Sequence, residues 1–111
     1  RQLRLNLLNN LQKSLTKNGV LLITFWEFLD DSSLNKKIIP WEKINLKSED
    51  VEEHDYLLDW KGDSNNLRYC HYFSLSEKEW LVKNSQTKLV TSFRSDGRNG
   101  ELNTYFLLKK I

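Results

Sequence analysis

The chain has 111 residues, of which 39% are hydrophobic and 29% charged, and its formal net charge at pH 7 is +2. These values are typical of one globular domain or part of one, and so small a charge does not by itself indicate a nucleic-acid-binding protein. No apolar run approaches the roughly 20 residues of a membrane-spanning helix, no signal-peptide pattern opens the chain, and a single cysteine excludes an internal disulfide.

The first predicted element is an amphipathic helix over residues 3–15. Gly19 follows it and is suited to the left-handed conformation that ends many helices. Methionine is absent and the helical pattern starts directly after Arg1, so we expect the natural protein to begin upstream. Five leucines at helical spacing form the expected buried face: Leu3, Leu7, Leu8, Leu11 and Leu15.

Residues 20–26 are almost continuously apolar, which is typical of a strand buried on both faces of a parallel sheet. Helix, turn and buried strand make half of a βαβ unit, so the predicted fold class is α/β. Trp26 and Glu27 come at the carboxyl end of this strand, where open α/β sheets bind their ligands. The alternative is that Trp26 covers the core while the acids that follow it lie in a solvated loop.

Residues 27–67 are the least regular part of the chain and are expected to form an insertion or lid. An acidic start predicts a helix over residues 49–60, and the polar run 61–66 predicts a turn or linker. His54 lies among these acids and is interpreted as a solvated side chain. An insertion of roughly 40 residues at the edge of a ligand crevice is more often functional than decorative.

Residues 68–73 predict a short strand that carries a cation, three aromatic rings, an imidazole and the only thiol. Side chains alternate across a strand, so Arg68 and Cys70 share one face while Tyr69 and His71 share the other. Cys70 and His71 are therefore a poor nucleophile–base pair. The pattern S-x-x-E at residues 74–77 then opens a predicted helix over residues 75–84.

The last predicted element is a hairpin over residues 88–109. Strands are expected at residues 89–94 and 102–108, and two Asx-Gly pairs between them are hairpin signals. An antiparallel hairpin that closes a mainly parallel sheet is common in α/β enzymes.

Several catalytic signatures are missing from the sequence: a glycine-rich nucleotide loop, a paired-cysteine zinc motif and a nucleophile elbow. What remains is a set of aromatic and basic residues. Such residues hold unstacked RNA bases and phosphates; alternatively, the rings fill a small core and the arginines are solvated. The set comprises Trp26, Trp41, Arg68, Tyr69, His71, Tyr72, Arg94 and Arg98.

The order of four short segments resembles the wobble-uridine tRNA methyltransferases, an S-adenosylmethionine-dependent family that esterifies carboxymethyl-uridine in the anticodon. These segments are Trp26, then Ile39-Pro40-Trp41, then Tyr56-Leu57-x-x-Trp60-Lys61, then Arg68-Tyr69-x-His71-x-Phe73. The hairpin at residues 89–108 is similar to the final two strands of class I methyltransferases. Cys70 stands where the family usually has tyrosine, and Thr104 where it usually has tryptophan, so substrate handling is expected to differ in detail.

The resemblance implies that residues 1–111 are the C-terminal half of one class I, Rossmann-like methyltransferase domain, with a mainly parallel sheet closed by the hairpin. It implies that S-adenosylmethionine is bound mainly by residues before Arg1, so no cofactor-binding or catalytic residue is assigned here and no metal ligand is expected. The substrate-binding residues that it implies are Arg68, Tyr69, His71, Trp41 and Trp26.

The resemblance implies two partners, tRNA and a small zinc-binding activator subunit, and no association with a membrane. The expected location is the cytoplasm, with the nucleus as a second location. Two other functions remain open: a class I methyltransferase acting on another substrate, and a non-catalytic paralogue that acts as a binding module.

Overall fold

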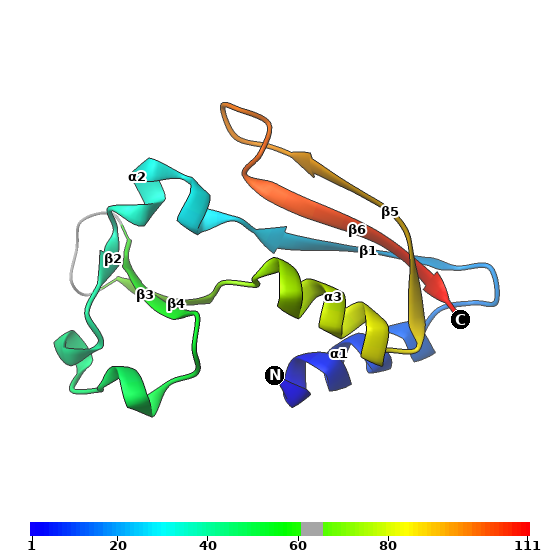
Figure 1. The fold of residues 1–111 in the computed structure, drawn as a ribbon, viewed down its shortest axis with the longest axis horizontal. Helices are drawn as coiled ribbons and strands as arrows, with labels where there is room; N and C mark the ends of the chain where they lie inside the picture. The colour runs from blue at the N-terminus through cyan, green and yellow to red at the C-terminus, as the bar shows by residue number, and fades with distance from the viewer. Residues whose placement is uncertain (61–65) are drawn as a thin grey trace. The chain divides into compact units, whose positions relative to one another are not determined.

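The computed structural model describes residues 1–60 and 66–111 and divides into two compact units (Figure 1). Unit 1 comprises Arg1–Trp26 and Phe73–Ile111, and unit 2 comprises Glu27–Tyr72. The turn predicted at residues 61–66 lies outside the described residues except for its last position. Whether the chain is half of a methyltransferase domain stays a prediction.

Unit 1 contains a three-stranded sheet in the order β1-β6-β5, formed by β1 (Val20–Trp26), β6 (Asn103–Lys110) and β5 (Thr87–Ser95). Both pairings are antiparallel. The sheet of unit 2 is antiparallel as well. The prediction of an α/β, Rossmann-like fold with a mainly parallel sheet is therefore wrong for the described residues.

The apolar run over residues 20–26 misled the prediction because composition does not encode the direction of the neighbouring strand. β1 pairs with β6 from Val20↔Lys109 to Trp26↔Asn103. Its burial alternates: Phe25 is 6% exposed, whereas Val20 and Leu22 are 48% and 53% exposed. β1 is thus a half-buried strand, as antiparallel sheets allow, and not a strand buried on both faces.

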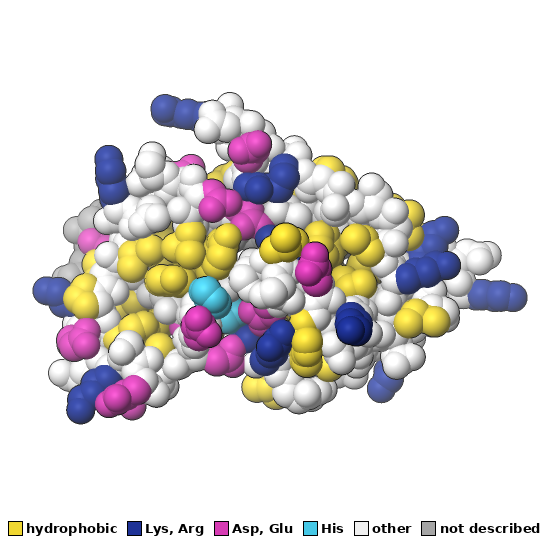
Figure 2. Space-filling view, in the orientation of Figure 1, with side chains coloured by type: hydrophobic (Ala, Val, Ile, Leu, Met, Phe, Trp, Pro, Cys, Tyr) yellow, Lys and Arg dark blue, Asp and Glu magenta, His cyan; other side chains and the backbone are white. Residues whose placement is uncertain are grey.

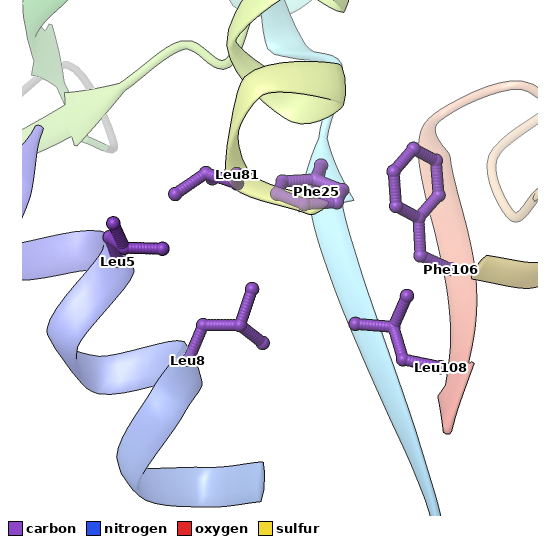
Figure 3. Close-up of a cluster of buried hydrophobic side chains, with 6 residues drawn as sticks. All are labelled: Leu5, Leu8, Phe25, Leu81, Phe106 and Leu108. Carbon is purple, nitrogen blue, oxygen red and sulfur yellow. The ribbon is translucent and has the colours of Figure 1, made fainter. Parts of the chain in front are cut away.

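Two helices, α1 (Gln2–Lys13) and α3 (Leu75–Asn84), pack against one face of this sheet. The helix over residues 75–84 is confirmed, and the hydroxyl of its N-cap Ser74 accepts a hydrogen bond from the backbone N–H of Glu77 at 3.2 Å. Figure 3 shows the buried side chains that join the helices to the sheet. They are Leu5, Leu8, Phe25, Leu81, Phe106 and Leu108.

The N-terminal helix is present, but its buried face matches the predicted one only at Leu8. Leu5 and Leu8 are buried, whereas Leu3 and Leu7 are 82% and 59% exposed. The helix ends at Lys13, where backbone bonds from residues 14 and 15 to residues 11 and 12 tighten the last turn. Gly19 does not adopt the left-handed conformation that was predicted for it.

The two strands predicted near the C-terminus are present as β5 and β6, and the predicted turn residues lie between them. Gly97 has a φ of +73°, and a Cβ at this position would lie 2.8 Å from the Cβ of Leu102. Tyr105 and Asn103 both donate hydrogen bonds to the carboxylate of Asp96. These two hydrogen bonds lower the pKa of Asp96, and the bond from Tyr105 has the larger effect. The hydrogen bond to Asp96 in turn raises the pKa of Tyr105.

Unit 2 is built from short elements around a second antiparallel sheet in the order β2-β3-β4. The strands are β2 (Ile38–Ile39), β3 (Asp55–Asp59) and β4 (Leu67–His71). The helical turns are η1 (Phe28–Asp30), α2 (Ser32–Asn35), η2 (Trp41–Ile44) and η3 (Ser48–Asp50). The strand predicted at residues 68–73 is confirmed as β4, shifted by one residue at its start and ending at His71.

The helix predicted over residues 49–60 is wrong: this segment holds η3 and β3. Its acids favour a helix start locally, but His54 has a φ of 69°, which no α-helix can contain. β3 instead pairs with β2 and β4 on its two sides and contributes two nearly inaccessible leucines, Leu57 and Leu58. Long-range strand pairing therefore outweighed the local helical signal.

Phe28 organises the interior of unit 2. It is fully buried, and its ring lies edge-on to Tyr56 and Tyr72, with centroids 5.8 Å apart in each pair. Such edge-to-face contacts add to the burial of apolar area. Tyr72, one of the aromatic residues that could have held RNA, thus packs within this unit.

Hydrophobic side chains also remain visible at the molecular surface (Figure 2). Among the described residues, no helix has the length and apolar character needed to cross a membrane.

Candidate substrate-binding site

β4 presents the predicted site residues on its two opposite faces. In the pairing with β3, His71 lies opposite Asp55 and Tyr69 opposite Leu57, whereas Arg68 lies opposite Leu58. Because alternate residues share a face, Tyr69 and His71 lie together and Arg68 projects from the other side. The structure therefore brings together two of the three residues that were predicted to border one pocket.

Asp55 connects the two residues on the first face. Its Oδ1 lies 2.6 Å from Nδ1 of His71 and 2.9 Å from the hydroxyl of Tyr69. An ionised carboxylate can only accept, so both neighbours donate, and His71 carries its proton on Nδ1. The side chains of His71 and Asp55 are only 7% and 8% exposed, so this contact is protected from water. The second carboxylate oxygen of Asp55, Oδ2, accepts a hydrogen bond from the backbone N–H of Glu52 at 3.0 Å.

Trp41 lies next to Tyr69 and completes an aromatic pair. The ring centroids are 6.3 Å apart and the rings are tilted by 47°. Trp41 begins η2 directly after Pro40, whose extended conformation sets the start of that turn. Tyr69 is 57% exposed, so one large ring remains open to a ligand. We call Trp41, Asp55, Tyr69 and His71 the Tyr69 face.

Arg68 instead stacks on Trp60, with its guanidinium carbon 4.0 Å from the ring centroid. Lys37 approaches the same ring, with Nζ 5.0 Å from the centroid. Cys70 shares this side of β4 and is buried. Burial raises the pKa of the Cys70 thiol, and the charge of Arg68 offsets part of that rise. A buried thiol of this kind is a structural residue and not a nucleophile.

Trp26, the remaining predicted site residue, ends β1 in unit 1 and is partly buried opposite Asn103. Its contribution to the substrate site stays a prediction.

Sequence reasoning missed two residues that matter for this arrangement. Asp55 and Trp60 were both placed in the helix predicted over residues 49–60, which conceals their relation to a strand. The segment Asp55–Asp59 reads D-Y-L-L-D, which does not alternate between polar and apolar residues, so no local pattern marked it as a strand.

S-adenosylmethionine, which the resemblance implies, does not fit the Tyr69 face. Nucleotide cofactors need a glycine turn for close backbone approach and an acid for the ribose. The described residues of unit 2 contain no glycine, and Asp55 is already bonded to Tyr69 and His71. The described residues of the Tyr69 face therefore do not fit this cofactor.

No family model matches the chain, and neither a curated protein nor a solved structure matches it. Membership of the wobble-uridine tRNA methyltransferases therefore stays a prediction from the sequence.

Proposed function

We propose that this chain supplies the substrate side of a tRNA methyltransferase that converts carboxymethyl-uridine at the wobble position into its methyl ester. The carrying observation is the Tyr69 face, where an exposed tyrosine ring lies beside Trp41 and the Asp55–His71 pair. Aromatic faces of this kind hold unstacked RNA bases. The order of the segments around Trp41 and Tyr69 in the sequence supports the same proposal.

The chemistry required of these residues is substrate handling. The acceptor is a carboxylate that is already ionised, and hence nucleophilic, near pH 7. Orientation then matters more than a strong general base. Asp55 fixes the orientation of both the Tyr69 hydroxyl and the His71 ring, so the face is ordered before a ligand arrives. The methyl donor belongs to residues outside this face.

A binding module without catalytic activity is the second candidate. It draws on the same observation, because an exposed tyrosine ring beside Trp41 can hold a base whether or not a methyl donor is bound. In that case the same aromatic residues bind RNA, and no methyl transfer follows.

Two assays on the natural polypeptide that contains these residues separate the candidates. The first measures transfer of labelled methyl groups to bulk tRNA that lacks the final ester, and the second measures binding of an anticodon stem-loop. Loss of a base–aromatic stack costs about 1–3 kcal/mol, so Tyr69→Ala should weaken binding by roughly 5-fold to 150-fold. Phe93→Ala, which removes a 48% exposed ring in unit 1, is the matched control.

Methyl transfer that depends on Tyr69 supports the methyltransferase. Binding without transfer and without uptake of S-adenosylmethionine supports the binding module. Methylation of a small molecule or protein but not of tRNA assigns the chain to another methyltransferase. Stem-loop binding that Tyr69→Ala leaves unchanged refutes the proposed role of the Tyr69 face.

A further inference from the structure

The second face of β4 carries a compact group of cations on one aromatic ring. We call Lys37, Trp60 and Arg68 the tryptophan–cation cluster. Both cationic groups lie within 5.0 Å of the Trp60 ring centroid. Stacking on an indole holds a guanidinium plane in place while its edge N–H groups stay available to a ligand. Arg68 is exposed and Lys37 and Trp60 are partly exposed, so a ligand can reach all three.

Neither cation of this cluster is neutralised by a carboxylate among the described residues, where no ion pair or side-chain hydrogen bond is made by Lys37 or Arg68. Asp59 is next to Trp60 in sequence, but alternation directs its side chain to the opposite face. Two like charges on one small surface repel each other, and an anion between them relieves that repulsion. The cluster thus has the charge and geometry of an anion site.

The position of β4 connects this cluster to the Tyr69 face. β4 is an outer strand of the β2-β3-β4 sheet, so its two faces meet at an open edge. Arg68 and Tyr69 are consecutive residues that project to opposite sides of that edge. A polyanionic chain that passes along the edge can present a base to Tyr69 and a phosphate to Arg68. A single small ligand cannot lie on both faces.

We propose that the tryptophan–cation cluster binds a phosphodiester of the RNA whose base is held at the Tyr69 face. This inference rests on the proposed function, because it takes RNA as the substrate. Arg68 is placed to reach a phosphate and not a ligand held at Tyr69 and His71, since it faces away from both. Arginine binds phosphate oxygens through two N–H groups, and lysine adds a point charge.

The salt dependence of RNA binding tests this inference. The anisotropy of a labelled anticodon stem-loop is measured with the natural polypeptide that contains these residues, over a series of potassium chloride concentrations. Each lost phosphate contact lowers the slope of log K against log salt by about 0.7–0.9. Lys37→Gln and Arg68→Gln should each produce that change, and the double variant should lower the slope by about 1.5.

Lys36→Gln is the matched control, because Lys36 is an exposed neighbour of Lys37 that does not approach the Trp60 ring. It removes the same charge and should leave the slope nearly unchanged. Far-UV circular dichroism and the unfolding midpoint verify that each variant is folded. Arg68→Lys keeps the charge but loses the planar stack, so it should retain the slope while weakening binding.

The outcomes separate this inference from the proposed function. If Tyr69→Ala weakens binding but the cluster variants keep the wild-type slope, the phosphate site is wrong and the RNA substrate stands. Binding of inorganic phosphate without any effect of the cluster variants on the RNA slope overturns it equally. If the wild-type chain binds no stem-loop at any salt concentration, both the RNA substrate and the phosphate site are rejected.

Discussion

Replacing Asp55 with alanine removes the hydrogen-bond acceptor that joins Tyr69 and His71 of β4. The variant leaves the Nδ1–H group of His71 without its partner, in a side chain that is only 7% exposed. It also removes the partner of the Tyr69 hydroxyl, which belongs to an exposed residue and can bond to water instead. The backbone N–H of the exposed Glu52 also loses its bond to Oδ2 and can bond to water instead. The three losses therefore differ in magnitude, and the loss at His71 dominates.

A hydrogen bond to a charged group contributes about 1.5–3 kcal/mol, and an exposed one contributes about 0.5–1 kcal/mol. We therefore expect Asp55→Ala to lower the free energy of unfolding of unit 2 by roughly 3 kcal/mol. Asp55→Asn keeps one acceptor oxygen but loses the charge, so it should cost about half as much.

Urea unfolding followed by tryptophan fluorescence measures this change, because Trp41 and Trp60 report on unit 2. With a slope of about 1–2 kcal/mol per molar urea, the midpoint should fall by about 2 M. Asp59→Ala is the control on the same face of β3. Its Oδ1 is buried and has no hydrogen-bond partner among residues 1–60 and 66–111, so the removal of this side chain should be neutral or stabilising.

A double-mutant cycle with His71→Ala isolates the contact between the two residues. We expect a coupling energy of about 1.5–3 kcal/mol, because each single variant already removes the shared hydrogen bond. The contact would be refuted if the losses of unfolding free energy in the two single variants summed to that of the double variant within about 0.5 kcal/mol. Equal losses for Asp55→Ala and Asp59→Ala would refute it as well.

Three further predictions concern unit 1. Leu108→Ala should cost about 2–5 kcal/mol in urea unfolding, because Leu108 is fully buried, whereas Leu3→Ala, at an 82% exposed site, should change stability by no more than about 0.5 kcal/mol. Gly97→Ala should lower the free energy of unfolding by about 1–3 kcal/mol more than Gly100→Ala in the same assay, because both positions have a positive φ but only a Cβ at position 97 would clash with Leu102. Equal losses for the two variants would contradict this. The lowered pKa of Asp96 means that its two hydrogen bonds stabilise the hairpin above about pH 4 and are lost as pH falls through the folded-state pKa, which lies below 3.8. Asp96→Asn should therefore abolish this acid-dependent part of the unfolding midpoint, and an unchanged pH profile would argue against it.

The parts of the fold that were predicted from sequence are those whose signals are local. Ser74 and Glu77 mark a helix start that the structure reproduces, and the Asx-Gly pairs mark the turn of the hairpin. The direction of β1 could not be predicted, because an apolar run specifies burial and not the neighbour it pairs with. The failed helix over residues 49–60 has the same cause, since β3 is stabilised by partners far along the chain.

In the candidate site, too, the features that could be predicted are those with a local signal. Alternation along β4 was sufficient to place Tyr69 with His71 and to separate them from Arg68. Asp55 could not be found, because its contact with His71 spans 16 residues and depends on the pairing of β3 with β4. The sequence thus identified the side chains of the proposed site, but not the carboxylate that Tyr69 and His71 share.

The bonds of Asp55 also have a consequence for how β4 is aligned on its neighbour. Asp55 lies opposite His71 and diagonal to Tyr69, so it can bond both only when the strands pair as observed. A slip of one residue would carry the imidazole and the phenol to the face opposite Asp55 and bring the Cys70 thiol to the side on which Tyr69 is 57% exposed. Asp55 therefore acts as a register lock, and a shifted alignment of this strand should be detectable as a thiol that reacts readily in the folded protein.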